Sequence, residues 1–156
     1  MALLLAFTLA VSPYTIQRDR AVGPLRIGTA TLSQARATYG QPTTVRYRPN
    51  TCIARWRPLR LALFFLSFGG DPCTSSTLVF ATAASHRWKT DRGLRVGNRR
   101  ARLLALYPHA KAHPDGWWLI TRRACKDVGG NPFPALKTQM GSRRVTALVV
   151  SANICE

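Results

Sequence analysis

The residues that could carry catalysis are few and widely separated along this chain. It contains six acidic residues and three histidines among 156 residues. No two carboxylates have a spacing that suggests a general acid and base pair. Asp71 and Asp115 stand in turns rich in glycine and proline, where turn formation explains their presence. The sequence therefore favours a protein that is not an enzyme.

One histidine pair has the spacing of two metal ligands on a helix face, His109 and His113. Pro108 and Pro114 bracket the pair and disfavour a regular helix, so we expect a solvated loop there. No phosphate-binding loop, dinucleotide fingerprint or Gly-x-Ser-x-Gly motif is present. We therefore expect neither a metal nor a cofactor.

Arginine alternating with aromatic residues is the pattern with the clearest chemical meaning. It occurs in residues 46–48, 55–57, 87–89 and 117–123. On a strand, Arg55 and Arg57 would share one face while Trp56 points to the other. If Trp56 packs beneath a helix, the arginines form an exposed face that binds acidic groups through charge-assisted hydrogen bonds. The alternative is an ordinary solvated sheet face over a Trp-rich core.

The net charge agrees with such a surface. The chain has 23 lysines and arginines against six acidic residues, giving +17, and both halves are cationic. A field of this size attracts polyanions with an affinity that falls as salt is added. Arginine-rich composition without a binding role is the alternative. The candidate partner-binding residues are Arg46, Tyr47, Arg55, Arg57, Trp117 and Arg122.

Residues 2–11 form an uncharged apolar run that is too short to span a bilayer. The run predicts a signal peptide over residues 1–12, although the positive segment expected before it is missing. A buried first strand or helix is the alternative. We therefore expect a secreted or cell-envelope protein that is not integral to the membrane.

Four cysteines, at positions 52, 73, 125 and 155, permit three pairings. Two fall in each half, and none has Cys-x-x-Cys spacing. In an oxidising compartment we expect Cys52 to pair with Cys73, and Cys125 with Cys155. Free, buried cysteines in a cytosolic protein are the alternative.

Two similar segments, residues 25–28 and 94–97, each precede a helical pattern. Thr29 is expected to cap the first helix, which Gly40 ends, and Asn98 to cap the second, which Pro108 ends. The apolar stripes expected to face the core are Leu32, Ala35 and Tyr39 in the first helix and Ala101, Leu104 and Tyr107 in the second.

Three strand patterns follow each helix. They cover residues 51–57, 60–68, 78–83, 117–124, 135–140 and 145–151. These patterns predict an α+β protein of two tandem units, each a helix plus a three-stranded antiparallel meander, with the helices packed on one face of the sheet or sheets. The expected units are residues 23–84 and 93–156, joined by a linker of residues 85–92.

A family resemblance accompanies this pattern. The segment from Ile27, Gly28 and Thr29 to Gly40 and Pro42 resembles the helix start and Gly-x-Pro ending of the beta-lactamase-inhibitor-protein-like family and the related SmpA/OmlA lipoprotein domains. The second repeat departs from it at its helix end. Residues 88–97 also resemble small secreted proteins of actinobacteria. The resemblance implies a tandem-repeat fold and a binding or assembly role, with no contact residue carried over by motif.

Two functions are compatible with these observations. The first is a module that binds an acidic protein through an arginine-bearing and aromatic sheet face. The second is non-specific binding to an anionic polymer, whether cell wall, membrane surface or nucleic acid, which would show steep salt dependence.

Overall fold

An eight-stranded antiparallel sheet is the main element of the protein. The structure, a computed structural model, describes residues 12–126 and 129–152. The strands run in the spatial order β4-β5-β6-β7-β12-β11-β10-β9, so the pairing of β7 with β12 joins two runs of consecutive strands. Their bounds are β4 Thr44–Arg48, β5 Thr51–Trp56, β6 Leu61–Leu66, β7 Thr77–Ala83, β9 Lys111–His113, β10 Gly116–Arg123, β11 Pro132–Met140 and β12 Val145–Ser151.

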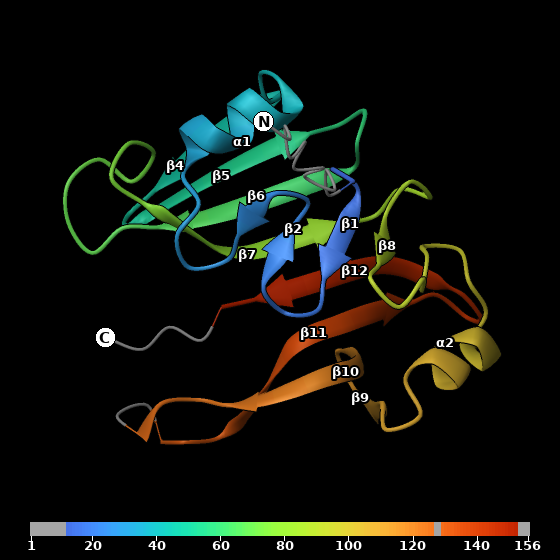
Figure 1. The fold of residues 1–156 in the computed structure, drawn as a ribbon. Coiled ribbons are helices and arrows are strands. Elements are labelled where there is room, and N and C mark those ends of the chain that lie inside the picture. Colours follow the sequence, from blue (N-terminus) through green and yellow to red (C-terminus); the bar gives the residue numbers. More distant parts are fainter. Residues whose placement is uncertain (1–11, 127–128, 153–156) are drawn as a thin grey trace, which may run out of the picture.

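A four-stranded sheet and two helices cover one side of this large sheet (Figure 1). The small sheet has the order β3-β2-β1-β8. Its strands and the helices are β1 Thr15–Gln17, β2 Ala21–Val22, β3 Leu25–Arg26, β8 Lys89–Thr90, α1 Leu32–Tyr39 and α2 Arg100–Leu106. No described helix is both long and apolar enough to cross a membrane.

Strand β6 shows why this sequence forms a sheet with one covered side. Leu61, Leu63 and Phe65 are buried, while the residues between them are half-buried. A period of two places alternate side chains on opposite faces, so the three buried residues point together toward the helices. The apolar run predicted a strand here, and the structure confirms it.

A capping box and a glycine set the two ends of helix α1. Thr31 is its N-cap and forms a capping box with Gln34, in which each side chain accepts a hydrogen bond from the other residue's backbone N–H. Gly40 ends the helix at φ 77°, a conformation that glycine adopts without steric cost. The expectation of Thr29 as the cap was wrong by two residues, because the Thr31 hydroxyl is the one that lies over the free backbone N–H of Gln34.

Helix α2 differs more from its prediction. Its N-cap is Arg99, without a side-chain cap, and the carboxamide oxygen of Asn98 accepts from the backbone N–H of Arg95 instead. Leu103 is buried, whereas Ala101 is exposed and Leu104 is half-buried. Tyr107 is buried as predicted, but the rest of the stripe was rotated, because the helix starts one residue later than the motif indicated.

The core under the helices is one cluster that spans the chain. It contains residues of both helices, the small sheet and both runs of the large sheet. Trp88, which is fully buried, donates its indole N–H to the Leu59 carbonyl oxygen. Trp56 donates to the Gly40 carbonyl oxygen, and the Tyr39 ring contacts both tryptophans edge-on. Burial raises the pKa of the Tyr39 hydroxyl, which lies 2.9 Å from the Pro13 carbonyl oxygen.

The predicted fold class was wrong. Strands make up 45% of the protein and helices 12%, so the fold is mostly β, and its centre is one continuous eight-stranded sheet in place of two helix-plus-three-strand repeats. Sequence patterns identified six strands of this sheet, but they missed β4 and β9 at its two edges. Edge strands carry weak patterns because only part of each is buried.

The disulfide between Cys52 and Cys73 is confirmed, with a Cα–Cα distance of 5.1 Å. It closes a loop over a sequence separation of 21, which the chain-entropy model rates at about 3 kcal/mol of stability. The predicted partner of Cys125, Cys155, lies outside the described residues, as do residues 1–11 of the expected signal peptide.

Candidate binding surface

The side of the large sheet that faces away from the helices is the candidate binding surface. Paired residues on neighbouring strands point to the same side of a sheet. One row of such pairs crosses five strands through Arg55, Ala62, Thr82, Val149 and Lys137. It alternates with the row of core residues under the helices, so it lies on the opposite side, which we call the open face. None of the described helices or strands covers the open face.

An apolar centre occupies the first half of the open face. Ile53, Phe64 and Phe80 are consecutive partners on β5, β6 and β7. The Phe64 and Phe80 rings pack edge to face with centroids 5.1 Å apart. Val149, the β12 residue paired with Thr82 and Lys137, has no exposed area. The centre is therefore a packed apolar surface rather than a set of isolated side chains.

Three arginines border this apolar centre. Arg46 and Arg48 on β4 are the partners of Ile53 and Thr51 on β5. Arg55 lies two residues after Ile53 on β5 and points to the same face. Their guanidinium groups make no hydrogen bond or ion pair with any other described residue. The positive charge at this edge is thus not neutralised within the described part of the chain.

At the opposite end of the open face, one acidic and one basic side chain are paired within the molecule. Asp115 accepts hydrogen bonds from the Lys137 ammonium group and the Trp118 indole. The Lys137 hydrogen bond, followed by that of Trp118, lowers the pKa of the Asp115 carboxyl group. The His113 ring stacks on Trp118 with centroids 3.7 Å apart. This network pairs Asp115 with Lys137 inside the molecule, while Lys111, the β9 partner of Trp118, stays outside it.

The structure does not bring the six predicted binding residues together. Arg46 and Arg55 share the open face, and Arg57 lies just beyond β5, where its backbone N–H donates to the Thr43 hydroxyl. Tyr47 pairs with Cys52 and Trp117 with Thr138, which places both on the covered side. The Trp117 ring is already occupied there by the Arg100 guanidinium, 4.9 Å from its centroid.

Arg122, the sixth predicted residue, is bound within the molecule. Its guanidinium donates to Asp19, in the turn between β1 and β2, across a sequence separation of 103. The Asp19 side chain is only 7% exposed. Burial, the largest single influence, would raise the pKa of its carboxyl group. The hydrogen bond from Arg122, a backbone hydrogen bond and the charges of Arg122 and Arg20 together outweigh burial and lower that pKa. The pair joins the small sheet to β10.

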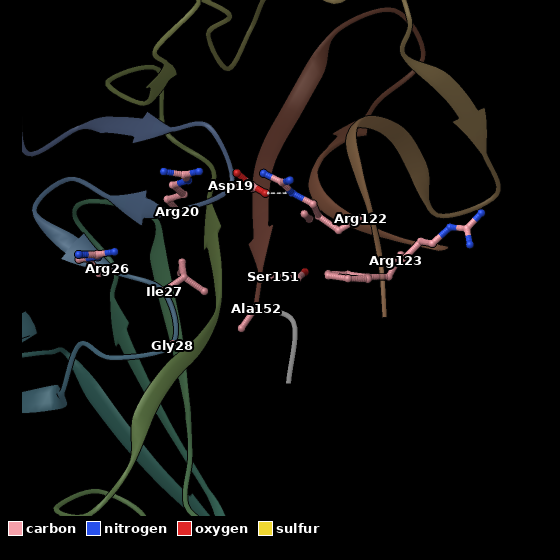
Figure 2. A pocket seen from close by; sticks show the side chains of 11 residues that line it. Asp19, Arg20, Arg26, Ile27, Gly28, Arg122, Arg123, Ser151 and Ala152 are labelled. Carbon is pink, nitrogen blue, oxygen red and sulfur yellow. Dashed lines mark hydrogen bonds and ion pairs between the residues drawn. The ribbon is translucent and has the colours of Figure 1, made fainter. Parts of the chain in front are cut away.

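A cavity of about 470 Å³ lies beside this pair. Figure 2 shows Arg122 directed at Asp19, while Arg26 and Arg123 point away from each other. The arginines around this cavity therefore do not converge on one point as an anion site requires. We assign the cavity no ligand.

Sequence analysis missed one exposed aromatic residue. Phe68 is 70% exposed and Tyr47 is 64% exposed, and no other large apolar side chain in the described ranges is exposed. Phe68 follows Ser67, whose backbone N–H donates to the Asn50 carbonyl oxygen, so it lies near the β4–β5 turn. The sequence predicted a strand over residues 60–68, which placed Phe68 inside the sheet. In the structure β6 ends at Leu66, so Phe68 lies beyond the strand.

Among the residues that the structure describes, no group of three or more His, Cys, Asp or Glu side chains could hold a metal ion. The predicted loop at His109 and His113 instead leads into β9, where His113 packs against Trp118.

Comparisons with known proteins add no relative. No protein-family model, no curated protein and no solved structure matches the chain.

Proposed function

We propose that this protein is a binding module whose open face takes an acidic protein partner. The observation that supports this most directly is the bare side of the eight-stranded sheet, where Arg46, Arg48 and Arg55 border a packed apolar centre and have no partner in the described chain. Protein interfaces combine an apolar core with a polar rim in which arginine is enriched.

Charge complementarity indicates an acidic partner. The acidic residue that the structure places at the open face, Asp115, is already engaged by Lys137 and Trp118. A partner carboxylate can therefore form charge-assisted, bidentate contacts with the arginines without displacing an internal ion pair. The apolar centre would supply the desolvated contact area.

A site-directed crosslinking experiment tests the proposal. A photoreactive phenylalanine analogue would replace Phe64 on the open face, and in a matched control would replace exposed Ala37 of α1. We expect the Phe64 position alone to crosslink to one acidic protein, and unlabelled protein to compete for it. The isolated complex would then be measured by calorimetry.

Charge reversal completes the test. Arg46→Glu with Arg48→Glu should raise the Kd of that complex at least about tenfold, since each charge-assisted contact contributes this order of affinity. The matched control, Arg36→Glu with Arg95→Glu, removes the same charge from exposed positions away from the open face and should leave the Kd unchanged. Equal effects of the two double variants, or crosslinks at Ala37 alone, would reject the proposal.

A second candidate function is binding to anionic polymers, supported by a separate arginine cluster beside α2. The Arg100 backbone N–H donates to the Arg143 carbonyl oxygen, and Arg99 forms a β-bridge with Arg144. Together with Arg102, all of these side chains are exposed. If the protein has this function, the double variant Arg99→Glu, Arg102→Glu should reduce the salt dependence of its binding to heparin or DNA. The double variant Arg46→Glu, Arg48→Glu should reduce that salt dependence less.

A further inference from the structure

The turn between β5 and β6 borders a second cavity, of about 270 Å³, at the edge of the open face. Ala62 and Thr82 form its inner wall, and the lining is mostly apolar. Ala62 and Thr82 are partners on β6 and β7 and belong to the open-face row that begins at Arg55. Two sheet strands therefore fix the position of this wall.

Three arginines surround this apolar wall: Arg55 at the end of β5, and Arg57 and Arg60 in the turn. None of the three guanidinium groups has a hydrogen-bond or ion-pair partner among the described residues. Three positive charges beside a small apolar space favour a ligand that is both apolar and anionic.

We propose that this cavity binds a small aromatic carboxylate, with its ring against Ala62 and Thr82 and its carboxylate among the guanidinium groups of Arg55, Arg57 and Arg60. A dry cavity of about 150 Å³ accommodates benzene, so the larger space here suits one ring with a short acidic chain. The planar guanidinium fork matches a carboxylate with two parallel hydrogen bonds.

The backbone at Arg60 makes the proposal testable without damage to the fold. Arg60 has φ 48°, in the left-handed region that favours glycine, and its backbone N–H closes the turn on the Arg57 carbonyl oxygen. Arg60→Gly therefore removes a guanidinium group from the cavity while relieving the backbone. This site shares Arg55 with the proposed protein-binding surface, but its test changes Arg60 alone, so the outcome does not depend on the protein-binding function.

The experiment is a titration of the full chain with 3-phenylpropionate, followed by NMR and calorimetry. We expect a Kd on the order of 1 mM or tighter, as ligand efficiency allows for a molecule of this size. The largest amide shifts should fall at Ala62 and Thr82. Two control probes, 3-phenylpropionamide and acetate, lack the charge and the ring respectively, and each should bind at least about tenfold more weakly.

Variants locate the carboxylate. Arg60→Gly should weaken binding of 3-phenylpropionate about tenfold or more, while Arg36→Gly, a control on α1, should not change it. If the amide binds as tightly as the acid, if Arg60→Gly binds like the parent chain, or if the shifts map away from Ala62 and Thr82, the proposal is overturned. Absence of binding at about ten times the expected Kd also overturns it, whatever the outcome of the crosslinking experiment.

Discussion

At the scale of single residues, the molecule separates arginines that are used internally from arginines that are not. Arg122 bonds Asp19, Arg100 lies over Trp117 and Arg144 donates to the Gly97 carbonyl oxygen. Arg46 and Arg60, in contrast, have no partner in the described ranges. A charge that stays unpaired contributes little to folding stability, so its substitution can affect binding without unfolding the protein.

Arg60 gives the first prediction. Alanine at this position keeps the strain of a side chain at φ 48°, and glycine relieves it. We expect Arg60→Gly to be more stable than Arg60→Ala by about 1 kcal/mol, the usual cost of a Cβ in the left-handed region. Urea unfolding of both variants measures this difference. Equal stability would show that the turn rearranges around Arg60.

Asp19 gives the second prediction, for pH dependence. Its folded-state pKa lies below its unfolded value of 3.8, so the stability that it contributes is fully present above pH 3.8 and is lost as pH falls through the folded-state pKa. Because Arg122 is half exposed, that contribution is about 0.2 to 1 kcal/mol. Asp19→Asn should reduce the loss of stability between pH 5 and pH 2 by about that amount, measured by urea unfolding at each pH. An unchanged pH profile would contradict the role of the pair.

At the scale of elements, irregular strand pairing shapes the second half of the large sheet. The register between β10 and β11 shifts on either side of Ile120, and the β11–β12 register shifts after Gln139. Such bulges bend and twist a sheet. At the start of β10 the backbone of Gly116 passes so close to β11 that a side chain has no room. Trp117 and Trp118, the next residues along β10, point to opposite faces of the sheet, as successive strand residues do.

Gly116 therefore gives the third prediction. A Cβ at Gly116 would lie 2.0 Å from the Thr138 carbonyl oxygen, and its φ is 128°. Gly116→Ala must displace β10 from β11, and we expect a loss of more than about 2 kcal/mol in the free energy of unfolding.

The matched control is Gly69→Ala, since nothing lies within 4 Å of a Cβ at Gly69. It should change stability by less than about 0.5 kcal/mol. Thermal unfolding of the two variants makes the comparison, and similar melting temperatures would contradict the close approach of β10 to β11.

At the scale of the whole molecule, one core connects both runs of the large sheet. Leu103 of α2, Trp88 and Leu32 of α1 belong to the same cluster of buried residues. The β7–β12 pairing adds main-chain hydrogen bonds between the two runs. A continuous core and a continuous sheet favour cooperative unfolding of both halves together.

Leu103 gives the fourth prediction. It is fully buried, so Leu103→Ala should lower the free energy of unfolding by about 2 to 5 kcal/mol. Because unfolding is cooperative, hydrogen exchange of β5 amides in the first half and β11 amides in the second half should report the same loss. A loss confined to β11 would show that the two halves unfold independently.

Short-range patterns explain which predictions succeeded. Six strands, helix α1 with its end at Gly40, and the Cys52–Cys73 disulfide all follow from hydrophobic periodicity, from glycine or from cysteine placement, which act over a few residues or within one half of the chain. The edge strands β4 and β9, and the small sheet, have no such pattern because their few residues depend on distant partners for burial.

The sequence by itself determined the charge of this protein, most strands of its large sheet and the placement of Trp56 opposite Arg55, because these depend on composition and on the two-residue period of a strand. Only the tertiary structure decided that the two runs of strands form one sheet, and which arginines stay unpaired. Arg122 and Arg46 are the same residue type in similar strand patterns, yet Asp19, 103 residues away, neutralises one and nothing described neutralises the other. Local sequence does not encode such long-range contacts, because the partners meet only when the whole chain has folded.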